Sequence, residues 1–157
     1  MTNTDPYTAK NLFLGIGNAQ RGDDAVGPML AEKLQDLDTD FAILPHSGEG
    51  ASLIHLWTGK EKVVVVDAMK TSKRTGTIHR FEAHHEKLHY GVFRYSSHLF
   101  GLAEAVETSR ALGLLPKTLI IYGIEGKDFT MGAPLTPAVA KALTRVEKKV
   151  REDLKVP

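Results

Sequence analysis

Two aspartates and one histidine are the residues of this sequence best placed to do chemistry. Asp24 ends a glycine-rich stretch at residues 15–24, and Asp67 directly follows four successive valines. His98 opens an apolar segment after two serines. Two carboxylates and one imidazole suit a divalent transition-metal ion with open coordination positions. Asp24, Asp67 and His98 are therefore predicted to be catalytic and to bind one metal ion, provided that the fold brings them together.

The segments before the two aspartates are predicted to be parallel strands. Residues 11–16 form an apolar run that leads into the glycine-rich stretch. Residues 63–66 are β-branched without polar alternation, which is typical of a strand covered on both faces. Residues just past the carboxyl ends of neighbouring parallel strands gather at one crevice of an open sheet. This rule places Asp24 and Asp67 in the same crevice.

Strand and helix patterns alternate along the rest of the chain. This alternation predicts an α/β fold, a three-layer α/β/α domain with a mostly parallel, roughly five-stranded twisted sheet. Residues 1–10 are predicted to be a flexible N-terminal segment, and residues 11–157 a single domain. The spacing of apolar residues and turn signals predicts strands at 11–16, 41–44, 63–66, 77–81 (an edge strand) and 118–124, and helices at 25–37, 51–57, 99–112 and 137–154.

Composition narrows the class of protein. With 157 residues, of which 42% are hydrophobic, the chain is long enough to bury one core. A formal charge of +1 gives no reason to expect a nucleic acid or an anionic membrane as partner. The absence of cysteine excludes disulfides, thiolate nucleophiles and cysteine-ligated metal sites. No secretory signal and no apolar run of roughly 20 residues is found, so a cytoplasmic location is predicted.

The glycine-rich stretch fails both standard tests for phosphate binding. The dinucleotide pattern requires a third glycine where this chain has Gln20, and the P-loop pattern requires lysine where it has Asp23. Adjacent carboxylates at Asp23 and Asp24 also oppose an anion at a helix amino terminus. The stretch therefore favours a cation.

Each candidate residue also has a purely structural interpretation. One of Asp23 and Asp24 is predicted to cap the following helix, which leaves the other available for function. Asp67 could stabilise a turn, and His98 could be a half-buried residue at a helix start. Only the joint placement of the three residues favours a functional site.

Other catalytic arrangements are less well supported. His84, His85 and His89 lie among charged residues and are predicted to be a solvated surface segment. No G-x-S-x-G motif occurs, and Ser97 adjoins His98 too closely for a catalytic triad. Asp24 and Asp67 could form a carboxyl pair, but neither lies in the Asp-Thr-Gly or Asp-Ser-Gly setting of aspartic proteases.

Four motifs together resemble the hydrogenase maturation protease family. The similarity covers residues 11 to about 151. The motifs are Gly15-Ile-Gly17-Asn18 with Gly22-Asp23-Asp24-Ala25-Val26-Gly27-Pro28, then Val65-Val66-Asp67-Ala68, then Ser96-Ser97-His98 with Gly101-Leu102, and Leu114-Leu115-Pro116 before the strand at 118–124.

The resemblance implies an endopeptidase that removes the C-terminal extension of a nickel–iron hydrogenase large-subunit precursor after nickel insertion. It implies that Asp24, Asp67 and His98 recognise nickel supplied by the precursor, with no permanently bound cofactor. Family members have Glu or Asp at the first of these positions, and here it is Asp24. The loop Ser47-Gly48-Glu49-Gly50 stands where the family has a glycine-rich loop, and these four residues are predicted to bind substrate.

Two alternatives remain open from the sequence. A non-catalytic metal-binding or docking chaperone for a metalloenzyme precursor could use the same crevice without cleaving a bond. A nucleotide-binding domain is suggested by the fold and the glycine-rich stretch only, and a fold does not determine function.

Overall fold

One sheet of five strands forms the centre of the structure, a computed structural model that describes residues 4–89, 93 and 98–155. The strand order is β2-β1-β3-β5-β4, in which the first four strands are parallel and β4 is an antiparallel edge strand. This confirms the predicted sheet and the edge position of the strand near residue 78. The strands are β1 (Asn11–Ile16), β2 (Phe41–His46), β3 (Lys62–Met69), β4 (Ile78–Glu82) and β5 (Thr118–Glu125).

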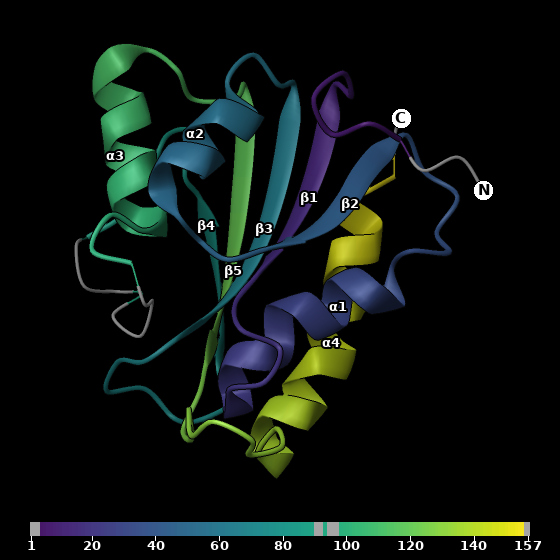
Figure 1. Cartoon of the computed structure of the whole chain (residues 1–157), viewed down its shortest axis with the longest axis vertical. Helices are drawn as coiled ribbons and strands as arrows, with labels where there is room; N and C mark the ends of the chain where they lie inside the picture. The colour runs from purple at the N-terminus through teal and green to yellow at the C-terminus, as the bar shows by residue number, and fades with distance from the viewer. Residues whose placement is uncertain (1–3, 90–92, 94–97, 156–157) are drawn as a thin grey trace.

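Helices cover both faces of this sheet, as Figure 1 shows. Two of them pack with one core and two with the other, so the predicted three-layer α/β/α architecture is confirmed. A short 3-10 turn, η1 (Gly22–Ala25), precedes the first helix. The helices are α1 (Val26–Lys33) and α4 (Pro137–Asp153) on one face and α2 (Gly50–Trp57) and α3 (Leu102–Leu112) on the other.

The valines of β3 explain why the sheet is sandwiched. Val63 and Val65 belong to the core beneath α2 and α3, whereas Val64 and Val66 belong to the core beneath α1 and α4. All four are fully buried. Side chains of successive strand residues point to opposite faces, so a continuous β-branched run requires an apolar layer on each side.

Several element boundaries differ from the prediction, most clearly those of the first and third helices. The helix expected from residue 25 begins as η1, and α1 ends at Lys33. The helix expected from residue 99 begins at Leu102, because Gly101 has extended backbone and its N–H donates to the Glu104 carboxylate (3.2 Å). Leu99 and Phe100 therefore lie outside α3 and are exposed.

β3 is longer than predicted, and this changes the position of Asp67. The strand continues to Met69, so Asp67 lies inside β3 rather than after it. Pairing between β1 and β3 ends at Gly15 and Val66, while β3 stays paired with β5 as far as Met69. Asp67 thus lies just past the last pair between β1 and β3. β1 has β2 on its other side, and the chain runs from β1 to β2 and then across to β3. Such a switch point is where open α/β sheets form crevices.

A buried lysine is one of the residues that hold the start of the chain against the rest of the structure. The buried Lys60 Nζ donates to the carbonyl oxygens of Pro6 (2.7 Å) and Ala9 (2.5 Å). Residues 1–3 lie outside the described residues, and the division into segment and domain stays a prediction. In the part of the chain that the structure describes, no helix has the length and apolarity needed to cross a lipid bilayer.

Two glycines allow α1 to lie directly against the sheet. A Cβ atom at Gly27 would overlap the Ile16 carbonyl oxygen and would lie 2.8 Å from the Val66 carbonyl oxygen. A Cβ atom at Gly15 would overlap the Gly27 carbonyl oxygen. The backbone of α1 therefore contacts the ends of β1 and β3 with no side chain between them.

We predict that Gly27→Ala lowers the free energy of unfolding by about 2 kcal/mol or more, because the methyl group meets backbone that cannot move aside. This outweighs the gain in helix propensity, which is about 1 kcal/mol for this change. Chemical denaturation measures the effect. Glu32→Ala, on the exposed face of the same helix, should change stability by less than about 0.5 kcal/mol. A Gly27→Ala variant as stable as the wild type would contradict this packing.

Candidate active site

A hollow of about 640 Å³ lies at the carboxyl ends of β1, β2 and β3. It contains both predicted aspartates, which confirms that the sheet brings Asp24 and Asp67 to one crevice. Residues of four separate segments form its walls. They are Ile16, Gly17, Asn18, Ala19, Arg21, Asp24, Pro28, Pro45, His46, Ser47, Asp67 and Met131.

Asp24 is held by the backbone of the glycine-rich stretch. Its Oδ2 accepts a hydrogen bond from the Asn18 N–H (2.8 Å), and a Cβ atom at Gly17 would lie 3.3 Å from Oδ1. Gly17 has φ of 142°, a conformation that favours glycine. Burial raises the pKa of Asp24, while the Asn18 N–H and the positive charge of Arg21 oppose this rise. The glycines thus let the chain fold closely around this carboxyl group.

Asp67 is more deeply buried than Asp24. Burial raises its pKa well above the usual value, and the negative charge of Asp24 raises it further. A hydrogen bond from the Ala68 N–H acts in the opposite direction. Two carboxyl groups in one buried hollow hold a proton more readily than they would in water. The same electrostatics favour a cation and disfavour a phosphate.

His98 lies outside the set of residues that line this hollow. It is half-buried, and its charge lowers the pKa values of His46 and Glu49, so it lies within electrostatic reach of the loop after β2. Across residues 4–89, 93 and 98–155, no three His, Asp or Glu side chains lie close enough to hold a metal ion. The structure therefore brings two of the three predicted ligands together, and the shared metal site stays a prediction.

The segment that carries His98 is docked on the loop before α2. The Gly50 N–H donates to the Phe100 carbonyl oxygen (2.8 Å). A Cβ atom at Gly50 would overlap the Phe100 ring. Glycine at this position lets the Phe100 ring and backbone pack directly against residue 50.

The predicted substrate-binding loop has mainly structural contacts. Ser47 is exposed and lines the hollow. Glu49 caps α2, since its carboxylate oxygens accept hydrogen bonds from the N–H groups of Ala51 (2.9 Å) and Ser52 (2.8 Å), which lower its pKa. Gly48 has φ of 92° and shapes the turn. Substrate binding by Ser47, Gly48, Glu49 and Gly50 stays a prediction.

His46 is a candidate that the sequence reasoning missed. It lines the hollow, and its Nδ1 accepts a hydrogen bond from the Gly48 N–H (2.9 Å). Its Nε2 lies 2.8 Å from the Ser52 hydroxyl oxygen. Burial lowers the pKa of His46, which favours the neutral ring. The strand-end rule that selected Asp24 also applies to His46, but the predicted strand stopped two residues too early.

Asp23 joins two loops instead of capping a helix. Neither Arg21 before η1 nor Ala25 before α1 makes a side-chain capping bond, so the prediction that Asp23 or Asp24 caps this helix is wrong. The fully buried Asp23 carboxylate accepts hydrogen bonds from loop 126–136, which follows β5. The donors are the N–H groups of Lys127 (2.7 Å), Asp128 (3.1 Å) and Thr136 (2.8 Å) and the Thr136 hydroxyl (2.9 Å).

The histidine cluster lies away from this hollow. His85 and His89 are exposed, as predicted for a surface segment. His84 differs, because it is half-buried and its Nδ1 accepts a hydrogen bond from the Leu119 N–H (3.1 Å) at the start of β5. This contact continues the pairing of β4 with β5.

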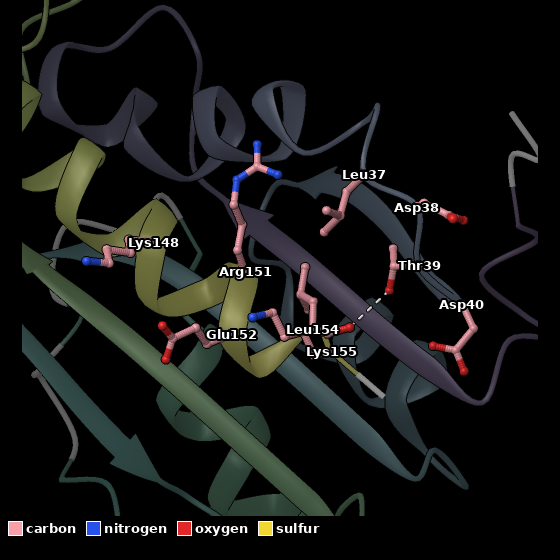
Figure 2. Close-up of a pocket in the computed structure, with 9 residues that line it drawn as sticks. All are labelled: Leu37, Asp38, Thr39, Asp40, Lys148, Arg151, Glu152, Leu154 and Lys155. Carbon is pink, nitrogen blue, oxygen red and sulfur yellow. Dashed lines mark hydrogen bonds between the residues drawn. The ribbon is translucent and has the colours of Figure 1, made fainter. Parts of the chain in front are cut away.

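A second hollow, of about 800 Å³, lies at the opposite end of the sheet (Figure 2). It is formed by the loop before β2 and the end of α4, which are joined by a hydrogen bond from the Thr39 hydroxyl to the Leu154 carbonyl oxygen (3.1 Å). Its charged side chains are of both signs and give no set of converging ligands. They are Asp38, Asp40, Lys148, Arg151, Glu152 and Lys155.

Comparison with known proteins identifies a family for this chain. A family model described as hydrogenase maturation protease (HycI) matches residues 29–153. The chain belongs to the hydrogenase maturation protease family. Its assignment as a hydrolase of this family is thereby confirmed.

Individual members of the family are distant relatives of this chain. The hydrogenase expression/formation protein HupD of Thiocapsa roseopersicina is 27% identical over 137 residues, which cover 85% of this chain and 62% of that protein. The hydrogenase 2 maturation protease of Escherichia coli is 26% identical over 148 residues and 90% of each chain. The crystal structure of HycI from Thermococcus kodakarensis superposes with a TM-score of 0.69 at 22% identity, covering 94% of each chain, and shows the same fold.

We predict that Asp23→Asn lowers the free energy of unfolding by about 2–3 kcal/mol, because both carboxylate oxygens accept buried N–H groups and an amide NH₂ would face one set of donors. Thermal or chemical denaturation measures this effect. The matched control is Asp36→Asn at an exposed position, which should leave stability nearly unchanged. Equal stability of the two variants would show that Asp23 does not hold the loops together.

A second prediction concerns pH. Between the ordinary pKa of 3.8 and the raised pKa of folded Asp67, the unfolded chain has released a proton that the folded chain retains. The stability contributed by Asp67 is therefore lost as pH rises through this window. Asp67→Asn removes the ionisable group, so its stability relative to the wild type should increase as pH rises from about 4 through this window. A stability difference between Asp67→Asn and the wild type that stays constant over this range would contradict a buried, protonated carboxyl group at Asp67.

Proposed function

We propose that this protein is the endopeptidase that removes the C-terminal extension of a nickel–iron hydrogenase large-subunit precursor after nickel insertion. The observation that carries the proposal is the pair of buried carboxyl groups, Asp24 and Asp67, in one hollow of a hydrogenase maturation protease fold. A hollow at the switch point of the sheet is open to a peptide. Two carboxyl groups supply the proton acceptor and cation ligands that metal-dependent peptide hydrolysis requires.

Nickel in this proposal belongs to the precursor and is part of the substrate. The raised pKa values of Asp24 and Asp67 show that their negative charges are costly in the hollow. A divalent cation that arrives with the substrate would offset this cost, and the His98 imidazole is a suitable third ligand. Because the precursor supplies the remaining ligands, the free protein should bind nickel weakly. No permanently bound cofactor is expected.

Asp24 is the better proton acceptor of the pair. It is less buried than Asp67, and Arg21 and the Asn18 N–H both favour its ionised form. The Asn18 hydrogen bond fixes Oδ2, so the proposal assigns to Oδ1 the proton of the attacking water. The water oxygen bonds to the peptide carbon, the carbon–nitrogen bond breaks, and the proton passes to the leaving amine.

We predict that Asp24→Asn, Asp67→Asn and His98→Ala each lower kcat/KM for cleavage of a nickel-loaded precursor by at least about 100-fold. Each change removes a carboxylate or an imidazole with little loss of apolar packing. Cleavage is followed by the change in precursor mass, and melting curves confirm that the variants fold. The exposed His85→Ala and His89→Ala variants should process the precursor at the wild-type rate.

Two results would count against the proposal. Near-normal processing by Asp67→Asn would show that the site lies elsewhere. A stable complex in which the wild-type protein leaves the precursor at full length would favour the non-catalytic docking chaperone. The cytoplasmic location is part of the same proposal, and fractionation of cells that produce the protein tests it.

A further inference from the structure

Met131 is an exposed apolar side chain on the wall of the acidic hollow. It is 63% exposed, although its side chain is large and apolar. The large exposed apolar residues in the described part of the chain include five others, of which none lines the hollow. Met131 comes from loop 126–136, far in sequence from the other lining residues, and borders the same hollow as Asp24 and Asp67.

The backbone around Met131 is fixed in place. Thr130 and Ala133 close a turn through a hydrogen bond of 3.1 Å, with Met131 and Gly132 at its centre. Gly132 has φ of 84°, as the third residue of a type II turn requires. The Gly132 N–H also donates to the Gln20 carbonyl oxygen (2.7 Å), which ties the turn to the glycine-rich stretch.

Further contacts anchor the base of the same loop. The Arg21 Nε donates to the Phe129 carbonyl oxygen (3.1 Å), and the Asp23 N–H donates to the Asp128 carbonyl oxygen (2.8 Å). The Asp23 carboxylate accepts the hydrogen bonds described above. The backbone on both sides of Met131 is thus hydrogen-bonded to the segment that carries Asp24. This fixed backbone holds the Met131 side chain in its exposed position.

Other apolar groups share the hollow with Met131. Ala19, Pro28 and Pro45 also line it, so a ligand there meets apolar atoms around the two acidic groups. An apolar side chain placed against these residues would gain free energy from burial. The walls therefore favour an apolar side chain close to the reacting bond.

We propose that Met131 is a specificity-determining residue that contacts an apolar side chain of the precursor next to the cleaved bond. The inference rests on the proposed function, because it takes the ligand of the hollow to be a peptide. Asp23 is a positioning residue in this scheme, since its carboxylate holds the loop that presents Met131. The proposal adds apolar recognition to the acidic chemistry of Asp24 and Asp67.

The test compares Met131→Ala with Met131→Leu and with Leu112→Ala. Leu112 is the control, because it is also exposed (65%) and does not line the hollow. It is the last residue of α3, an 11-residue helix whose two ends are about 15 Å apart. Met131→Ala should raise KM for the precursor about tenfold or more and leave kcat within about twofold, because it removes a contact made in binding. Met131→Leu should retain most of the affinity, and Leu112→Ala should match the wild type.

Precursor variants locate the contacting side chain. Each residue that flanks the cleaved bond is changed to serine in turn, and both proteins are assayed on each variant. One of these serine substitutions should weaken binding of the precursor to the wild-type protein but cause no further loss of binding to Met131→Ala. This non-additivity is the coupling expected of two side chains in contact.

Binding of the nickel-loaded precursor is also measured directly, so that the result does not depend on cleavage. A wild-type protein that binds without cutting overturns the proposed function, while weaker binding by Met131→Ala still supports recognition by this loop. Equal precursor affinity of Met131→Ala and the wild type overturns the inference, whether or not the bond is cut. An equal loss in Leu112→Ala also overturns it.

Discussion

The carboxylate of Asp23 is the interaction on which the geometry of the acidic hollow depends. It is fully buried and accepts hydrogen bonds from a loop more than one hundred residues later in the chain. A buried carboxylate without such donors would be strongly destabilising, so the turn at 22–25 and loop 126–136 are ordered together. Asp24 and Met131 are carried by these two segments. Their relative positions therefore follow from one set of hydrogen bonds.

Close backbone packing gives the site a second support. α1 contacts β1 and β3 through glycines, which brings the start of the helix against the ends of the strands. Asp24 lies directly before this helix, and Asp67 lies on β3 just past its last pair with β1. The sheet and the helix thus force two carboxyl groups into one hollow. The resulting rise in their pKa values is the electrostatic cost that a cation or a bound proton relieves.

The hollow combines this acidic pair with apolar walls, and the two features suit different parts of a peptide substrate. In the proposed function, Asp24 and Asp67 act at the cleaved bond, while Met131 and the prolines that line the hollow contact a neighbouring side chain. His46, with its ring held by Gly48 and Ser52, adds an imidazole whose pKa is lowered by burial to the same space. Recognition and catalysis would then draw on separate loops at one end of the sheet.

The sequence by itself determined the fold class, most helices and strands, and the placement of Asp24 and Asp67 in one hollow. Apolar periodicity reports which faces are buried, and the strand-end rule follows from parallel pairing, so both can be read locally. The role of Asp23 was predicted wrongly, because the partners of its carboxylate lie more than one hundred residues away in the chain. His46 was missed as a candidate, because the end of β2 depends on its pairing with the neighbouring strand. The contact of Phe100, two residues after His98, with Gly50 could not be predicted from the sequence either. Such contacts between loops depend on tertiary packing, since no local pattern in the chain encodes them.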